Sequence, residues 1–292
     1  MNHPTNLMHV TTQLWVYHSR LYHTNSGIFY SGGQSLLIDP GIFPDEIDGL
    51  SQALTEQNLT PFAILLTHSH WDHILGPERF PGVTIIAQDN FSPESSAGES
   101  AIRQSITRAW TDAGLPKARR FNIPVPDLIF NESMTLTVGA EQIRLIAAPG
   151  HSRDQCVGYH PATQTLWAAD MLSDLEIPYI SYNLAAYRRT LDFLAGLEIA
   201  QLVPGHGTPS GDRAEIQERL RADRGYLDQL GETIHQAVQE GCNLAETQVR
   251  AAAVNIRRPD LNAEPHRLNV ETVFAELGGD AGPGPVGWRK VE

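Results

Sequence analysis

The sequence predicts an α/β fold of layered strands and helices, followed by a region made only of helices. In the first two thirds of the chain, short apolar runs typical of strands alternate with segments whose apolar residues recur every three or four positions. Turns rich in glycine and proline separate these segments. From about residue 212 onward the pattern is charged and helical. The 292 residues, 41% of them hydrophobic, suffice for one large domain or for a domain with an appendage.

The first 90 residues are expected to form five strands and one helix. The strands cover residues 14–17, 27–30, 35–39, 62–66 and 83–87, and the helix covers residues 44–58. A Ser-Gly-Gly turn joins the second and third strands into a hairpin. The helix has one apolar face, because Ile47, Leu50 and Leu54 recur at helical spacing.

Residues 91–130 are interpreted as an insertion. We expect a polar loop over residues 92–100 and a helix over residues 101–113, with Ile102 and Ile106 on one face. Two roles remain open for this segment. It covers the functional site and shapes a substrate pocket, or it is a surface helix whose apolar face packs on the core.

The rest of the chain predicts more strands and then the helical region. Strands are expected over residues 134–138, 143–147, 156–159, 166–169 and 201–203, with a helix over residues 184–198. Later helices are expected over residues 212–240, 244–254 and 266–277. We therefore predict a main α/β domain over residues 1–211, a helical subdomain over residues 212–278, and a loose tail over residues 279–292.

A cluster of histidines and one carboxylate follows directly after the strand that ends at residue 66. Because side chains two apart point to the same side of an extended segment, His68 and His70 can bind one ion together. A turn into a helix would direct Asp72 and His73 towards a second ion. Imidazole and carboxylate are metal ligands near neutral pH, and this combination suits zinc best.

Three more residues of the same chemistry stand where later strands end. His151 and His206 each lie in a Pro-Gly turn after a strand, and Asp170 ends another strand. Functional sites form at such sheet ends in α/β folds. Asp39 ends the strand 35–39, and two interpretations are open for it. Its carboxylate orients a metal ligand, or it simply forms a turn before Pro40.

This order of ligands, over roughly residues 10–210, resembles the metallo-β-lactamase superfamily. The resemblance implies an αββα sandwich, in which two mixed sheets pack face to face between helices, with a dinuclear site at one sheet edge. It implies that Asp170 bridges two ions, one bound by three histidines and the other by an aspartate and two histidines. The two sets are His68, His70 and His151, and Asp72, His73 and His206.

The chemistry implied by this resemblance is hydrolysis. Two zinc ions, or alternatively iron or manganese, would share a hydroxide that attacks a carbonyl carbon. His70 stands where diiron flavoproteins of the family typically have a carboxylate, which favours zinc and hydrolysis over redox chemistry. Asp170 argues against a dedicated β-lactamase, because true β-lactamases of the superfamily lack a bridging aspartate. The remaining pattern is similar to that of glyoxalase II-type thioesterases, lactonases and related esterases.

Several residues are candidates for roles beyond metal binding. Asp72 could also steer protons, and Tyr179 or Tyr182 could donate to an oxyanion or could simply pack. In glyoxalase II the C-terminal helices help to bind the thiol carrier. In this chain Arg257, Arg258 and Arg267 are candidates for holding glutathione. The alternative interpretation is that these three are solvated surface arginines.

We therefore expect a dinuclear zinc hydrolase of a small thioester, ester or lactone. The alternative is a mononuclear iron persulfide dioxygenase of the same fold, while a β-lactamase, a nuclease or a non-catalytic binding module is less favoured. The net charge of −13 disfavours nucleic acid as a partner. The C-terminal helices could bind substrate, cap the site or form a homodimer.

The compartment is expected to be the cytoplasm. The N-terminal residues lack the pattern of a secretory signal, and no run is long enough to span a membrane. The two cysteines, Cys156 and Cys242, make neither a disulfide framework nor a thiolate metal site.

Overall fold

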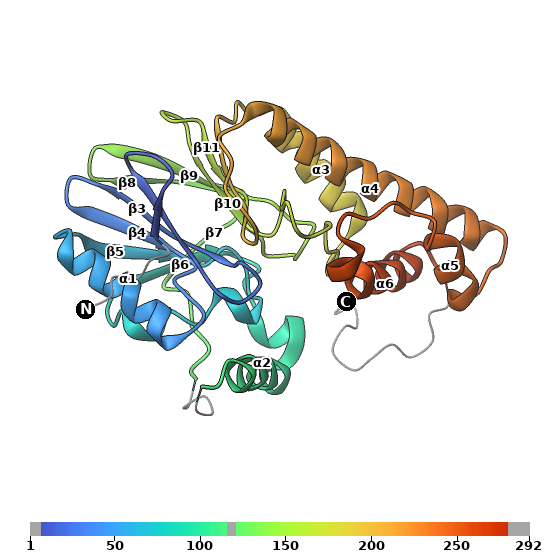
Figure 1. Cartoon of the computed structure of the whole chain (residues 1–292), viewed down its shortest axis with the longest axis horizontal. Coiled ribbons are helices and arrows are strands. Elements are labelled where there is room, and N and C mark those ends of the chain that lie inside the picture. Colours follow the sequence, from blue (N-terminus) through green and yellow to red (C-terminus); the bar gives the residue numbers. More distant parts are fainter. Residues whose placement is uncertain (1–6, 116–120, 280–292) are drawn as a thin grey trace.

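The computed structural model describes residues 7–115 and 121–279. Its body is a pair of mixed β-sheets packed face to face, with helices outside both (Figure 1). The seven-stranded sheet runs in the order β1-β2-β3-β4-β5-β6-β7, antiparallel up to β4 and parallel from β4 to β7. Its strands are β1 (Leu7–His9), β2 (Leu14–His18), β3 (Asn25–Ser31), β4 (Gln34–Ile38), β5 (Thr60–Leu65), β6 (Thr84–Gln88) and β7 (Leu128–Phe130).

The second sheet has five strands in the order β12-β11-β10-β9-β8. All neighbours are antiparallel except β11 and β12, which run parallel. Its strands are β8 (Ser133–Val138), β9 (Glu141–Ala147), β10 (Cys156–His160), β11 (Thr165–Trp167) and β12 (Gln201–Val203). Between the sheets lies an apolar core to which Phe29 and Leu36 contribute from one sheet and Leu145 and Trp167 from the other.

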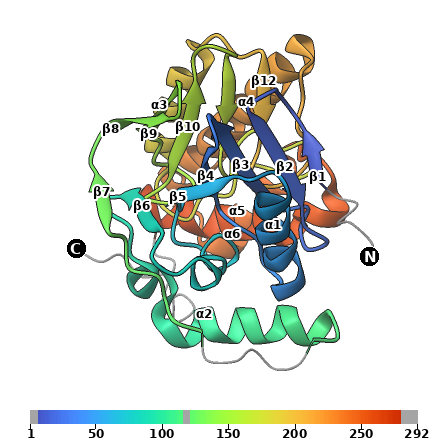
Figure 2. The ribbon, with the colours of Figure 1, turned by 90° about the vertical axis from the view of Figure 1, so that its left-hand side faces the viewer.

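Helices cover the outer face of each sheet, which gives four layers. Alternate residues of a strand point to opposite faces, so Ile28 and Ile64 face outward, where α1 (Pro44–Glu56) and α2 (Pro93–Asp112) pack in the same apolar cluster. Figure 2 shows α2 lying beneath the layer of α1. On the second sheet, α3 (Leu184–Ala195) and α4 (Arg213–Gln239) pack on Val157 and Leu202.

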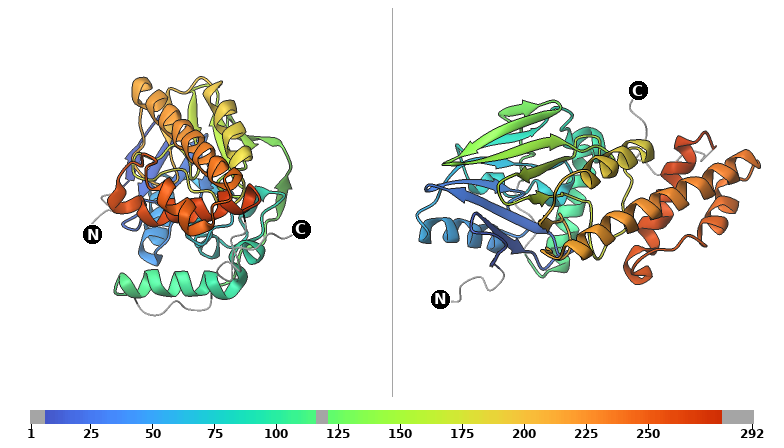
Figure 3. Two further views of the ribbon diagram at one scale, coloured as in Figure 1. Left: turned by 90° about the vertical axis from the view of Figure 1, so that its right-hand side faces the viewer. Right: turned by 90° about the horizontal axis from the view of Figure 1, so that it is seen from above.

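The C-terminal helices extend to one side of the sheets (Figure 3). The helices α5 (Leu244–Ala251) and α6 (Pro259–Glu276) pack against α4, and Ala251 and Phe274 join the cluster that covers the second sheet. The expected fold class is therefore confirmed: two mixed sheets between helices, with a helical C-terminal region. No helix in the described parts of the chain has both the length and the apolar character needed to cross a membrane.

Two expected boundaries were wrong. The polar loop expected over residues 92–100 is helical from Pro93, with a kink at Gly98, whose φ is +71°. Proline suits a first helical position, because its φ is already helical and its missing N–H would be unpaired there. The last helix starts at Pro259 rather than residue 266 and runs through Pro265. The side-chain amide of Asn262 there donates to the carbonyls of Arg257 and Arg258 and stabilises the helix start.

Other sequence predictions have different outcomes. The strands β1 and β7, of three residues each, were not expected. The subdomain boundaries at residues 211 and 278 stay predictions. From residue 280 on, the predicted tail lies outside the described residues.

Candidate metal centre

The histidine cluster lies where the chain leaves β5. Three residues beyond the end of the strand, His68 begins an extended stretch that leads into the short 3₁₀ helix η1 (Trp71–His73). The expected turn is therefore present, and it brings Asp72 and His73 to the same place as His68 and His70. All four side chains lie beyond the carboxyl end of a strand in a parallel part of the sheet.

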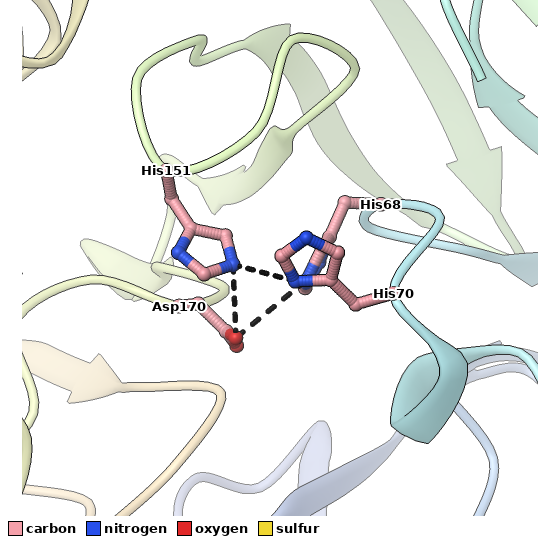
Figure 4. Close-up of side chains that lie close together, drawn as sticks. All are labelled: His68, His70, His151 and Asp170. Atoms are coloured by element: carbon pink, nitrogen blue, oxygen red, sulfur yellow. Dashed lines mark hydrogen bonds and ion pairs between the residues drawn. The ribbon is translucent and has the colours of Figure 1, made fainter. Parts of the chain in front are cut away.

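The structure brings all seven predicted ligands together in two groups. Within each group, one ligand atom per residue lies within 4.8 Å of the others. The first group, shown in Figure 4, is His68, His70, His151 and Asp170, and the second is Asp72, His73 and His206.

The carboxylate of Asp170 lies between the two groups. Its Oδ2 atom is 3.3 Å from His151 Nε2 in the first group and 3.3 Å from His206 Nε2 in the second. Its Oδ1 atom is 3.2 Å from His73 Nε2. Asp170 therefore has the position that a bridging ligand would need.

Three of the histidines are oriented through their Nδ1 atoms. His151 Nδ1 donates to the carbonyl of Tyr179 at 2.9 Å, and His206 Nδ1 donates to the carbonyl of Tyr22 at 3.2 Å. His73 Nδ1 donates to Asp39 Oδ2 at 2.9 Å. Because Nδ1 donates a hydrogen bond in each ring, Nε2 is the nitrogen left to bind a metal ion.

Asp39 supports a fourth histidine through Thr67. The Thr67 hydroxyl donates to Asp39 Oδ2 at 2.6 Å, so its lone pair can accept from His68 Nδ1 at 3.1 Å. Asp39 Oδ1 also accepts from the backbone N–H of Thr67 at 2.8 Å. Both interpretations of Asp39 hold, because it orients His73 and its φ of +43° also turns the chain towards Gly41.

Two buried atoms indicate that the site suits a cation. Among the described residues, His68 Nε2 has no hydrogen-bond partner, and Asp170 Oδ1 makes no hydrogen bond of ordinary geometry although it lies 3.2 Å from His73 Nε2. Buried polar atoms left unpaired are costly, and an imidazole nitrogen beside a carboxylate oxygen offers ligands for a divalent ion. The first group, with three imidazoles and one carboxylate, is a set typical of zinc.

The electrostatics of the first group favour neutral imidazoles. Burial lowers the pKa of His68 and of His70, and it lowers the pKa of His151 to about 3. A histidine binds metal through its neutral form, so these three rings are ready to act as ligands.

The second group is more strongly influenced by the carboxylates. Burial disfavours charge on His206 and His73, but Asp170 and the other nearby acids outweigh burial, so the pKa of His206 rises to about 10 and that of His73 rises well above its usual value. Burial also opposes charge on Asp170, yet the histidines around it hold its pKa well below its usual range. A divalent cation would replace these protons in balancing the carboxylates.

Other side chains surround the site, and no local pattern in the sequence marks them. Tyr22 is 56% exposed and its ring lies edge-on to both Trp71 and His206, with ring centroids 6.4 Å apart in each pair. The Ser181 hydroxyl donates to the carbonyl of His151 at 2.5 Å. Asn25 is fully buried and donates to two carbonyls of the turn that carries His206, each at 2.8 Å.

The two tyrosines considered for substrate contact, Tyr179 and Tyr182, differ in their surroundings. The ring of Tyr179 lies 5.8 Å from that of His151, and burial, followed by the charges of Glu264 and Glu271, raises the pKa of Tyr179 to about 12. Its phenol therefore stays protonated near neutral pH. Tyr182 is exposed.

The three arginines considered for glutathione all have acidic partners. Arg257 pairs with the buried Asp223, and Arg258 pairs with Asp260. Arg267 pairs with Glu264 and Glu271. Because Arg257 is 20% exposed and its partner is buried, we assign it a structural contact.

Known proteins resemble this chain in sequence. The profile of the metallo-beta-lactamase superfamily matches residues 20–206. The human acyl-coenzyme A thioesterase MBLAC2 is 25% identical over 223 residues, which cover 68% of this chain and 76% of that protein. A hydroxyacylglutathione hydrolase of Cronobacter sakazakii is 38% identical over 73 residues, covering 24% of this chain and 26% of that protein.

Solved structures share the fold. A metallo-beta-lactamase family protein from Thermus thermophilus has a TM-score of 0.67 at 20% identity, covering 92% of this chain and 95% of that one. The sec-alkylsulfatase Pisa1 from Pseudomonas sp. has a TM-score of 0.71 at 17% identity, covering 96% of this chain and 52% of that one.

Proposed function

Because the chain belongs to the metallo-beta-lactamase superfamily, we propose that it is a dinuclear zinc hydrolase of small thioesters. A metal-dependent hydrolase is the general class. The two zinc ions and the thioester substrate are the specific parts of this proposal. The observation that carries it is the pair of ligand groups, with Asp170 in contact with both.

The second ligand group supports the proposal of two ions. Asp72, His73 and His206 lie within 4.8 Å of one another in a separate set, which could hold a second ion beside the one held by the first group. The imidazole-rich ligands support the proposal of zinc. Two bound ions would bring the pKa of a shared water close to neutral and would polarise the carbonyl of a substrate.

The protein's own residues prepare the site for this chemistry. Asp39 and the carbonyl of Tyr179 accept hydrogen bonds from the Nδ1 atoms of His73 and His151, which leaves both Nε2 atoms to hold metal ions. The negative charge of Asp170 lies between the two groups and would offset repulsion between the ions. The role of Asp72 in steering protons and that of Tyr179 as an oxyanion donor stay predictions.

The substrate class is proposed from the relatives. Two of them are named as hydrolases of acyl-coenzyme A and of hydroxyacylglutathione, and both substrates are thioesters. We place thioesters ahead of the esters and lactones that the sequence also allows. A small-molecule substrate is part of the proposal, while a homodimer and a cytoplasmic location stay predictions from the sequence.

The test combines metal analysis with a substrate panel. We expect about two zinc ions per chain by mass spectrometry of protein purified without added metal, with hydrolysis of acyl-coenzyme A or hydroxyacylglutathione exceeding that of lactones, esters and β-lactams. His151→Ala should abolish the activity, whereas His235→Ala on α4, which bonds to Gln239, should not. About one iron per chain with oxygen consumption on a persulfide would refute the proposal. Full activity of His151→Ala would also refute it.

A further inference from the structure

The segment from residue 171 to 181 connects the candidate metal centre to the C-terminal helices. It follows Asp170 directly and ends shortly before α3. Its backbone is held by side chains of two C-terminal helices. Asp223 on α4 accepts from Leu172 N–H at 3.1 Å, Asn262 on α6 accepts from Ile177 N–H at 3.2 Å, and Asn269 on α6 accepts from Ile180 N–H at 2.7 Å.

Asn269 binds this segment at two points. Its side-chain oxygen accepts from Ile180 N–H at 2.7 Å, and its side-chain N–H donates to the carbonyl of Pro178, also at 2.7 Å. The same amide nitrogen donates to the hydroxyl of Tyr226 at 2.9 Å. Asn269 is completely buried, and a buried amide with all its partners in place holds a fixed geometry.

Tyr179 lies between the two residues that Asn269 binds, and its carbonyl orients a candidate metal ligand. That carbonyl accepts from His151 Nδ1 at 2.9 Å. The next residues also reach His151, because Ser181 N–H donates to its backbone carbonyl at 2.9 Å. Both the ring and the backbone of His151 are therefore held by the stretch that Asn269 fixes.

The polar residues responsible lie on one face of α6. Asn262, His266 and Asn269 are spaced four and three positions apart, and all three are buried. The ring of His266 in turn bonds to the Tyr226 hydroxyl, at 2.9 Å, and to the carbonyl of Ala251, at 3.0 Å. Two of these buried residues, Asn262 and Asn269, bond to the backbone of residues 171–181, which explains why this face of the helix is polar although it is buried.

We propose that α6 positions the metal ligand His151 through Asn269 and the backbone of residues 178–180. Asn269 is thus a positioning residue, and it acts at a distance through the carbonyl of Tyr179. This gives the C-terminal helices a role that is separate from substrate binding and dimer formation. The inference rests on the proposed metal site, but it does not depend on which substrate is hydrolysed.

The test compares two asparagines of the same helix. Asn269→Ala and Asn262→Ala each remove a buried amide that bonds to the 171–181 segment, but only Asn269 binds the residues on both sides of Tyr179. We expect Asn269→Ala to weaken zinc binding about 10-fold, the lower end for residues that orient a ligand from outside. Asn262→Ala should destabilise the fold to a similar extent, as followed by urea unfolding, and leave zinc affinity unchanged.

A spectroscopic measurement separates positioning from general loss of stability. Cobalt(II) accepts the same types of ligand as zinc, and its visible absorption reports the geometry of the ligands around it. The cobalt spectrum of Asn269→Ala should differ from that of the unchanged chain, whereas the spectrum of Asn262→Ala should match it. If Asn269→Ala does not fold, Asn269→Asp takes its place, since it is nearly the same size but cannot donate to Pro178.

The outcomes distinguish this inference from the proposed function. Equal zinc affinity and equal cobalt spectra for the Asn269 variants and the unchanged chain would refute the role of Asn269, while leaving the metal site in place. Equal weakening by Asn262→Ala would also refute it, because the effect would then reflect stability alone. Failure of the unchanged chain to bind zinc or cobalt would overturn the proposed function and this inference together.

Discussion

Replacing Asp39 by asparagine tests how the site is supported from outside the ligands. Asparagine has nearly the same size and can keep the bond from Thr67 N–H, at 2.8 Å. Its NH₂ group, however, would replace the oxygen that accepts from His73 Nδ1 at 2.9 Å and from the Thr67 hydroxyl at 2.6 Å. The NH₂ group is itself a hydrogen-bond donor, and it would then face two other donors, His73 Nδ1–H and the Thr67 hydroxyl. We therefore expect Asp39→Asn to weaken the orientation of both His73 and His68.

The size of the effect follows from these two bonds. Hydrogen bonds to a charged group contribute about 1.5–3 kcal/mol each to the free energy of unfolding. Part of their loss also affects the metal-free protein, so zinc affinity should fall by less than the sum. Loss of a residue that orients a metal ligand typically weakens binding about 10–100-fold, or about 1.4–2.7 kcal/mol.

The assay for Asp39→Asn is competition for zinc with a chelator of known affinity. The matched control is Asp48→Asn, because Asp48 is an exposed carboxylate whose side chain pairs with Arg79 on the surface. That change should leave zinc affinity unaltered and alter stability by only about 0.2–1 kcal/mol. Zinc binding by Asp39→Asn that equals that of the unchanged chain would refute the view that Asp39 supports the site.

Three further changes test other parts of the structure. Removal of metal with a chelator should lower the melting temperature by roughly 10 °C relative to protein in zinc at about 1,000 times the Kd, because binding at that concentration stabilises the folded state by about 4 kcal/mol. An unchanged melting temperature in a calorimetric scan would contradict a metal site in the folded protein. Gly205→Ala should lower the zinc stoichiometry, measured by mass spectrometry, and should lower the free energy of unfolding by about 1–3 kcal/mol, measured by urea unfolding. The reason is that the added Cβ would lie 2.2 Å from Asp170 Oδ1. Arg257→Met should lower the free energy of unfolding of the zinc-loaded protein by about 3 kcal/mol at pH 8, as measured by urea unfolding. The reason is that the buried carboxylate of Asp223 would lose the guanidinium with which it forms an ion pair. Burial raises the pKa of Asp223 to about 6, so the folded chain binds this proton more tightly than the unfolded chain, and the resulting stability is lost as the pH rises through 6. The cost of Arg257→Met should therefore be smaller at pH 5 than at pH 8, and an equal or larger cost at pH 5 would show that this reasoning is wrong.

The fold class could be predicted because the apolar pattern is strong where strands are buried. Residues 62–66, which include most of β5, are a continuous apolar run, and a parallel strand covered on both faces gives such a run. The strands β1 and β7 contain three residues each, too few to show a period. The start of α6 was missed because Pro265 argues locally against a helix. Asn262, which donates to the Arg257 carbonyl at this start, also donates to the carbonyl of Leu175, a tertiary contact that the sequence does not show.

The candidate ligands could be predicted because metal chemistry restricts residue type. Only a few side chains offer a nitrogen or oxygen lone pair suited to zinc, and those of His68, His70 and Asp72 stand close together in the chain. His151 and His206 lie farther away, but each stands in a Pro-Gly turn after a strand. These are local features of the sequence, and together with the family resemblance, which adds Asp170, they led to the ligand set that we propose.

Only the tertiary structure decided which groups orient those ligands. The Nδ1 atoms of His206 and His151 bond to the carbonyls of Tyr22 and Tyr179. A backbone carbonyl occurs at every residue, so no residue type marks the ones that are used. Asn269 is similar, since an asparagine on a helix is usually exposed, and only the packing of α6 buries it against residues 178–180. Residue identity thus specified the chemistry, whereas the path of the folded chain decided how that chemistry is held in place.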